Sequence, residues 1–376
     1  MAALQADSDA GIVSMLGDMP LHTFMAECWQ KRPVLLRGVF PGDFCPIGQE
    51  DLMAAAMLDD ADSRLIVADE WPPELYYGPF EQDDFADLPE GDWTLLVQEM
   101  DRLRPEVAEV LNHFRFLPNW RVDDLMVSWA APGGGVGAHT DQYDVFLIQG
   151  LGSRRWEIDP RPIDDPVWRD DSEVAVLKDF EAVESWVLEP GDVLYLPPRV
   201  AHNGVALTGC MTLSVGFRAP APLELIESAL EALREAGRGL TRHVEESGST
   251  DDPGRISEDT LASLRGQMRA VFADDAMLNR LIAQSLSQPV RGRSGGVDES
   301  GGSRLVPCSA SQLLYYRQED QVVLCAGGES WTLPVVCLGA IAALTGTEGL
   351  EAESVAHAEL RRLLDELEGS GLIRRV

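Results

Sequence analysis

The sequence has little lysine and little positive charge of any kind. Lysine occurs only at Lys31 and Lys178, and 30 Lys and Arg residues face 63 Asp and Glu residues, so the formal net charge is −33. Proteins bind duplex nucleic acid largely by neutralising its phosphates with Lys and Arg. We therefore expect no DNA partner, and we expect basic partners to be attracted at low salt. The acidity is equally compatible with a role in solubility or salt adaptation alone.

Long apolar runs and paired cysteines are also missing. No run approaches the ~20 apolar residues that a membrane-spanning helix needs, and the N-terminus lacks the charged-then-apolar pattern of a secretory signal. The six cysteines are scattered and form no Cys-x-x-Cys pair. We expect reduced thiols, no membrane partner and a cytoplasmic location. The length of 376 residues indicates two or three domains.

A glycine-rich stretch, residues 133–137, leads into His139-Thr140-Asp141. On an extended strand, residues i and i+2 point to the same face. His139 and Asp141 can therefore reach one metal ion, whereas Thr140 points away. Asp144 falls on the opposite face, which makes it a poor ligand candidate.

His202 is the candidate for a third ligand. It follows a Pro190-Gly191 turn, a short apolar strand at 193–196 and the pair Pro197-Pro198. This spacing resembles the second motif of cupin barrels. Two histidines and one carboxylate form the facial triad of non-haem Fe(II) oxygenases. The alternative is that both histidines are structural, in a strand and a turn.

The spacing of apolar residues changes along the chain. Residues 21–30, 51–58 and 93–114 have helical spacing, with short strands at 34–37, 64–68 and 74–77. From Trp120 onward the pattern indicates short strands at 124–129, 139–149, 154–158, 186–188, 193–196, 204–206 and 211–217. Many short strands with Gly and Pro turns favour a barrel or sandwich, consistent with a double-stranded β-helix.

Helices return after the prolines at 220 and 222. We divide the chain into a catalytic barrel domain (1–220), a helical segment (221–288), a flexible linker (289–303) and a small winged-helix-like domain (304–376) that opens with a short helix at 309–316. The helical segment is predicted to form a homodimer or to pack on its own barrel. The predicted fold class is α+β.

At this point the chain resembles a known family, the bacterial JmjC-type ribosomal oxygenases of the cupin superfamily. The matching stretches are 29–34 (WQKRPV), 123–126 (DDLM), 132–137 (PGGGVG), 139–146 (HTDQYDVF), 154–156 (RRW), 189–192 (EPGD), 197–198 (PP), His202 and 214–220 (SVGFRAP). They extend from about residue 20 to 220. Thr140 departs from the leucine that bacterial relatives often carry.

The resemblance implies an Fe(II)- and 2-oxoglutarate-dependent oxygenase that also consumes O2, with His139, Asp141 and His202 as catalytic metal ligands. It implies a basic partner, large-subunit ribosomal protein 16, hydroxylated on an arginyl β-carbon. The residues alone leave open which arginine of the Arg154-Arg155 pair points inward. The resemblance implies Arg154, fifteen positions after His139, as the partner of the distal 2-oxoglutarate carboxylate.

The remaining site assignments concern the co-substrate and the substrate. We place Thr212 and Ser214 in the 2-oxoglutarate site, and Asp124, Gln142 and Tyr143 in the substrate site. Alternative functions are a histidyl hydroxylase of a ribosomal protein, another JmjC hydroxylase or demethylase, a cupin enzyme without co-substrate, and a winged-helix regulator with a sensory cupin.

Overall fold

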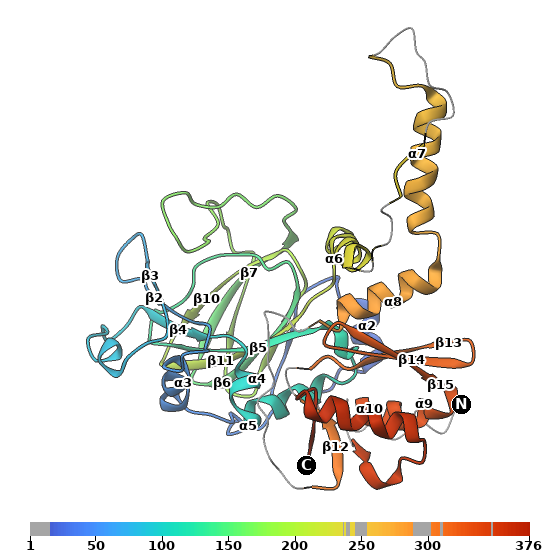
Figure 1. Cartoon of the computed structure of the whole chain (residues 1–376). Coiled ribbons are helices and arrows are strands. Elements are labelled where there is room, and N and C mark those ends of the chain that lie inside the picture. Colours follow the sequence, from blue (N-terminus) through green and yellow to red (C-terminus); the bar gives the residue numbers. More distant parts are fainter. Residues whose placement is uncertain are drawn as a thin grey trace. The chain divides into compact units, whose positions relative to one another are not determined.

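The computed structural model describes residues 16–376 except 236, 238–240, 245–253, 289–301, 309–310 and 347–348. The chain divides into two compact units, Met1–Ala219 and Pro220–Val376 (Figure 1). The division falls where the strand-rich pattern gives way to helices. The predicted linker at 289–303 lies almost wholly outside the described residues.

Two sheets form the first unit. The larger has eight strands in the order β1-β9-β6-β11-β5-β4-β2-β3, and the smaller has the order β10-β7-β8. Their bounds are β1 Val34–Leu36, β2 Ser63–Val67, β3 Glu74–Tyr77, β4 Trp93–Val97, β5 Val122–Ala130, β6 Asp144–Leu151, β7 Arg154–Pro162, β8 Glu184–Leu188, β9 Val193–Leu196, β10 Val200–Ala206 and β11 Cys210–Phe217. A side-chain hydrogen bond from Arg154 on β7 to Thr212 on β11 links the two sheets.

The central strands of the larger sheet are buried along nearly their whole length. All eight residues of β11 and seven of the eight in β6 are buried, which explains why they read as apolar runs rather than as alternating strands. Phe146 on β6 packs on Tyr195 of β9, with ring centroids 4.9 Å apart. Phe24 of the N-terminal helix α2 (Leu21–Glu27) joins this aromatic core at 5.1 Å from Tyr195.

Short helices cover the N-terminal part of the first unit. They are α3 (Gln49–Ala56), η1 (Gln82–Phe85), α4 (Met100–Leu103), α5 (Pro105–Ala108), η2 (Glu109–Phe114) and η3 (Asn119–Arg121). The prediction of helix across 93–114 is wrong at its start, because Trp93–Val97 forms β4 between β2 and β5. The pattern misled because four of these five residues are buried, and a short apolar run does not distinguish a strand from a helix.

The second unit begins with three helices, α6 (Pro222–Glu235), α7 (Glu258–Val271) and α8 (Asp275–Leu286). Two three-stranded sheets follow, β16-β12-β17 and β13-β14-β15. Their bounds are β12 Arg304–Pro307, β13 Leu314–Gln318, β14 Gln321–Ala326, β15 Glu329–Pro334, β16 Leu350–Glu351 and β17 Ile373–Arg375; the helical elements are η5 Val335–Cys337, α9 Leu338–Thr345, η6 Ala352–Ser354 and α10 Ala358–Gly369.

The short helix predicted at 309–316 is wrong where the structure describes it. Residues 314–318 form β13, which pairs antiparallel with β14, so the predicted hairpin is a three-stranded sheet. The buried leucines of α10, at 360, 363, 364 and 367, lie on one face at helical spacing and pack into the apolar core of this part. Among the described residues, no helix has the length and apolar character to cross a membrane.

Candidate active site

The two candidate histidines lie directly opposite one another. His139 forms an isolated antiparallel bridge with His202 of β10, and each donates its backbone N–H to the other's carbonyl, at 3.0 and 2.9 Å. Directly opposed residues in an antiparallel pair bring their side chains together. The imidazole centroids are accordingly 4.2 Å apart.

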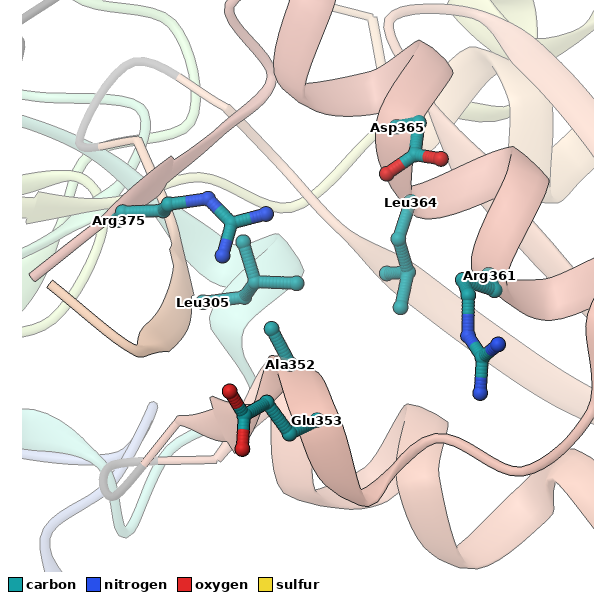
Figure 2. A pocket seen from close by; sticks show the side chains of 7 residues that line it. All are labelled: Leu305, Ala352, Glu353, Arg361, Leu364, Asp365 and Arg375. Carbon is teal, nitrogen blue, oxygen red and sulfur yellow. The ribbon is translucent and has the colours of Figure 1, made fainter. Parts of the chain in front are cut away.

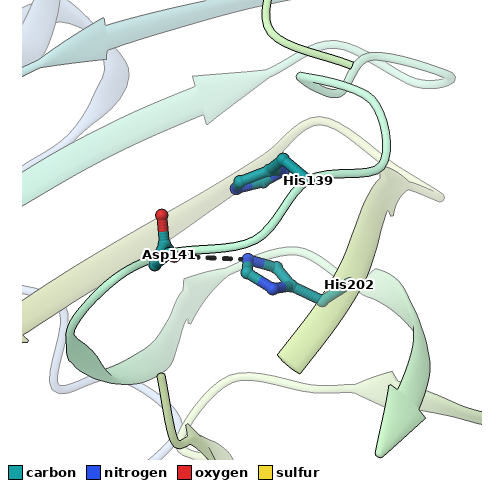
Figure 3. A group of neighbouring side chains, drawn as sticks. All are labelled: His139, Asp141 and His202. Atoms are coloured by element: carbon teal, nitrogen blue, oxygen red, sulfur yellow. Dashed lines mark ion pairs between the residues drawn. The ribbon is translucent and has the colours of Figure 1, made fainter. Parts of the chain in front are cut away.

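Asp141 completes the trio. One ligand atom from each of the three side chains lies within 4.8 Å of the others, and Asp141 Oδ2 is 3.5 Å from His202 Nε2 (Figure 3). The expectation of one strand from 139 to 149 is wrong, since β6 starts only at Asp144. The bridge to β10 at His139, and a hydrogen bond from the Arg199 N–H to the Asp141 carbonyl at 2.7 Å, hold the segment that connects to β6.

Hydrogen bonds orient both imidazoles. Nδ1 of His139 lies 2.9 Å from the Gly137 carbonyl, and Nδ1 of His202 lies 2.9 Å from the Val200 carbonyl. A carbonyl only accepts, so each Nδ1 carries the proton and each Nε2 presents a lone pair. Burial, reinforced by His139, lowers the pKa of His202 to about 4. Its ring is therefore neutral at physiological pH, the form that binds metals.

Tyr143 lies close to the carboxylate of the trio, and Asp141 is the first of the charged groups that act on its hydroxyl. Burial, followed by the carboxylates of Asp141, Asp124 and Asp123, raises the pKa of Tyr143 far above its usual range. The phenol therefore stays protonated and keeps a hydrogen to donate.

The structure buries Arg154 and leaves Arg155 half-exposed. Arg154 is 5% exposed, and its guanidinium donates to Thr212 Oγ1 at 3.3 Å and lies over the Trp156 ring at 5.4 Å. Arg155 lies 3.4 Å from Glu157 at the surface. Within the described part of the chain no carboxylate is at ion-pair distance from Arg154, and its Nε has no hydrogen-bond partner. Such a buried charge is costly unless an anion pairs with it.

Ser214 lies two residues after Thr212 on β11 and is also buried. The shared face follows from the period of two along a strand. The buried indole N–H of Trp156, close to Arg154, likewise has no acceptor among the described residues. Arg154, Thr212, Ser214 and Trp156 therefore form a polar patch inside the barrel with unused donors.

An irregularity in strand pairing organises the predicted substrate residues. Val215 pairs with Leu125 and Phe217 pairs with Val122, so Asp123 and Asp124 both lie opposite Gly216. This is a β-bulge, a device often found beside active sites. A Cβ added at Gly216 would stand 3.6 Å from Asp124 Oδ1 and 3.6 Å from the Tyr143 ring. The Asp124 carboxylate and the Tyr143 ring therefore lie close together at the buried Gly216.

The other predicted positions differ in their surroundings. Gln142 is exposed, and within the described part of the chain its side chain forms no hydrogen bond to this site. Sequence reasoning dismissed Asp144 as a ligand and missed its structural role. Asp144 is fully buried and accepts hydrogen bonds from Tyr195 at 2.5 Å, Arg121 at 2.9 Å and Gln30 at 3.0 Å. The only signal in the sequence was its place at the start of an apolar strand.

A separate hollow in the second unit lacks this chemistry. It encloses about 420 Å³ and is lined by Leu305, Ala352, Glu353, Arg361, Leu364, Asp365 and Arg375 (Figure 2). It contains no histidine or cysteine, and its charged side chains carry both signs. Within the described residues the histidine–carboxylate trio of the first unit is the group suited to a metal ion.

Comparisons with known proteins agree with this site. The JmjC domain model matches residues 109–225. The ribosomal protein uL16 3-hydroxylase of Escherichia coli is 44% identical over 212 residues, 54% of this chain and 54% of that enzyme, so the aligned chain spans about half of that relative's length. A probable ribosomal oxygenase of Haemophilus influenzae is 32% identical over 282 residues, 72% of this chain and 68% of the relative.

Solved structures extend the similarity to nearly the whole chain. An X-ray structure of E. coli YcfD has a TM-score of 0.83 and 31% identity, and covers 94% of this chain and 98% of that one. A structure of the same ribosomal oxygenase in complex with cobalt and 2-oxoglutarate has a TM-score of 0.79 and 32% identity over 94% and 98% of the two chains. With its JmjC/cupin fold of mixed helices and strands, the chain belongs to the JmjC-type ribosomal oxygenases.

Proposed function

We propose that this protein is an Fe(II)- and 2-oxoglutarate-dependent hydroxylase of an arginyl residue in large-subunit ribosomal protein uL16. One observation carries the proposal: a buried arginine without a carboxylate partner lies in the same barrel as a His-Asp-His trio whose donor atoms converge. A bound dicarboxylate that coordinates the metal supplies the anion that Arg154 lacks. A cupin enzyme without co-substrate has no use for that arginine.

The metal donors fit Fe(II). Two neutral imidazole nitrogens and one carboxylate oxygen, from His139, His202 and Asp141, are the donor set of the non-haem iron oxygenases. Fe(II) bound there supplies, with 2-oxoglutarate and O2, the oxidising power to hydroxylate an unactivated C–H bond. The protein's part is to fix the ligands: the carbonyls of Gly137 and Val200 hold the imidazoles, and the Arg199 N–H holds the backbone of Asp141.

Arg154 binds the distal carboxylate of 2-oxoglutarate, with Thr212 and Ser214 beside it on β11. The Arg154–Thr212 bond orients the guanidinium, and the unused Nε donor remains for the anion. Trp156 covers the guanidinium with its ring. This wall excludes water from the charged pair, which strengthens the pair electrostatically.

The target arginine binds at the bulge on β5. Asp124 supplies a carboxylate and Tyr143 an aromatic ring, and both lie beside Gly216. A guanidinium is recognised by this combination. With the guanidinium held there, the β-carbon of the same residue is directed toward Asp141 and the metal. Gln142 contacts the substrate backbone from the exposed segment between Asp141 and Tyr143.

The substrate protein is inferred from the relatives and from charge. The E. coli relative is named a uL16 3-hydroxylase, and ribosomal proteins are basic. A net charge of −33 accelerates association with such a partner, especially at low salt. Its place of action is the cytoplasm, where ribosomes are assembled.

The second unit serves assembly rather than DNA binding. Leu223, Ile226 and Leu230 are exposed on α6 at positions i, i+3 and i+7, which form one face of the helix. We assign this face, in the predicted dimerisation segment at 221–288, to a homodimer interface. The small domain at 304–376 is a winged-helix module without a role in groove binding, because acidic side chains are numerous on it.

Mass spectrometry of ribosomal proteins from cells with and without the gene tests the function. We expect one oxygen on one arginine of uL16 only when the gene is present. If the added oxygen is on a histidine instead, the enzyme is a histidyl hydroxylase. No gene-dependent mass change in any ribosomal protein contradicts the proposal.

A further inference from the structure

Another hollow, which lies in the first unit, is next to the metal-binding segment. It encloses about 210 Å³ and is lined by Ile66, Ala68, Asp69, Glu70, Trp71, Pro73, Gly135, Val136, Gly137 and Val176. Gly137 is the residue whose carbonyl accepts from His139 Nδ1. The wall of this hollow is therefore continuous with the backbone that positions a metal ligand.

The walls combine carboxylates, an indole and aliphatic side chains. Asp69 and Glu70 are exposed, and neither forms an ion pair within the part of the chain that the structure describes. Trp71 remains 51% exposed. Val136 and Val176 give an apolar floor, and the glycines at 135 and 137 keep one side free of side chains.

One lining residue, Trp71, already binds a guanidinium of the protein itself, just outside the hollow. The Arg169 guanidinium lies over the Trp71 ring at 4.1 Å. It also donates to both Asp171 oxygens, at 2.9 and 2.8 Å, and the Trp71 indole N–H donates to Asp171 at 3.1 Å. Stacking on an indole with a carboxylate at the edge is a recurrent arrangement for arginine. The protein's own arginine therefore uses the same chemistry that the hollow offers beside it.

We propose that this hollow is a docking subsite for a lysine or arginine side chain of the substrate polypeptide that flanks the hydroxylated residue. The inference rests on the proposed function and adds a second point of attachment beside the metal-binding segment. The volume is smaller than the ~300 Å³ at which small-molecule sites begin, so it fits one side chain rather than a cofactor. The aliphatic stem packs on Val136 and Val176, and the charged end reaches Asp69 and Glu70.

Peptide binding to the full-length protein tests the subsite directly. Two peptides carry the target arginine, one with basic flanking residues and one with glutamine in their place. The variant Asp69→Asn/Glu70→Gln should weaken binding of the basic peptide about two- to tenfold in calorimetry, because two exposed charge pairs are lost. Binding of the glutamine peptide should not change. The effect should shrink at high salt.

A matched control removes the same charge elsewhere. Asp43→Asn/Asp87→Asn neutralises two exposed carboxylates that do not line the hollow, and it should leave the difference between the peptides intact. If the control and the Asp69/Glu70 variant lose the same affinity for the basic peptide, the effect comes from net charge alone. The docking subsite is then wrong.

The two proposals fail in different ways. If the wild-type protein binds both peptides equally, the subsite is wrong whether or not oxygen is incorporated. If the wild type prefers the basic peptide through Asp69 and Glu70 but adds oxygen to neither, the docking subsite stands and the hydroxylase function fails.

Discussion

Replacing Arg154 by methionine should abolish 2-oxoglutarate use without weakening the fold. In the bound state the loss of a buried charge pair costs about 2–5 kcal/mol, at least about a 30-fold rise in the 2-oxoglutarate requirement. In the ligand-free protein, the same replacement should stabilise the fold rather than weaken it. Arg154 is buried without a carboxylate partner among the described residues, and burial lowers its pKa, so the charge itself opposes folding.

The net effect on the fold follows from what methionine keeps and removes. Methionine fills similar space and removes the desolvated charge. Among the described residues, the one side-chain hydrogen bond lost is that to Thr212 at 3.3 Å, worth about 1 kcal/mol. We therefore expect the thermal stability of Arg154→Met to equal or exceed that of the wild type. With the metal already bound, adding 2-oxoglutarate should raise the unfolding midpoint of the wild type further, since a ligand at 100 times its Kd contributes about 2.7 kcal/mol, and should not raise that of the variant.

Differential scanning calorimetry measures the thermal stability, and a succinate-release assay measures the 2-oxoglutarate requirement. Arg155→Met is the matched control in both. Arg155 is half-exposed beside Glu157, so its loss should change neither quantity appreciably. A large kinetic defect in Arg155→Met with none in Arg154→Met means that the register of β7 is wrong by one residue. A variant at Arg154 that unfolds at markedly lower temperature refutes the description of this arginine as a ligand-binding charge.

Four further predictions concern the rest of the molecule. Alanine at any of the three metal-site positions should abolish turnover while circular dichroism stays native, and full activity in one variant removes that residue from the ligand set. Tyr143→Phe should weaken Co(II) or Fe(II) binding about 10- to 100-fold if the hydroxyl orients the Asp141 carboxylate when the metal binds, and unchanged metal titration contradicts that role. Asp144→Ala should destabilise the first unit by about 3–5 kcal/mol in urea because a buried arginine loses its partner, against less than about 1 kcal/mol for Glu27→Ala in an exposed pair. Leu230→Glu should convert a dimer to a monomer in light scattering, and a monomeric wild type at micromolar concentration excludes the dimer.

The candidate metal trio could be predicted from the sequence because the spacing that identifies its ligands is local. The i, i+2 spacing of His139 and Asp141 requires only an extended segment, and it survives although β6 begins later than expected. The spacing of glycine, proline and His202 marks a turn and a strand end. That His202 faces His139 depends on antiparallel pairing between segments 63 residues apart, for which the motif resemblance was the only guide.

The features that sequence reasoning missed depend on long-range packing. Trp93–Val97 becomes a strand because β2 and β5 pair with it on both sides, information that a five-residue apolar run does not contain. The bulge that places Asp123 and Asp124 together opposite Gly216 is a property of the pairing register. The burial of Asp144 likewise requires Gln30, Arg121 and Tyr195 from three distant segments.

The most direct test of the account is an intact-mass assay of a uL16 peptide incubated with the enzyme, Fe(II), 2-oxoglutarate and O2. We predict a gain of one oxygen on the arginine peptide, one succinate released per oxygen incorporated, and no gain when that arginine is alanine. An unmodified arginine peptide, together with oxidation of a histidine-bearing ribosomal peptide, would contradict the substrate assignment. No oxygen gain on any ribosomal peptide, under conditions where 2-oxoglutarate binds, would contradict the hydroxylase itself.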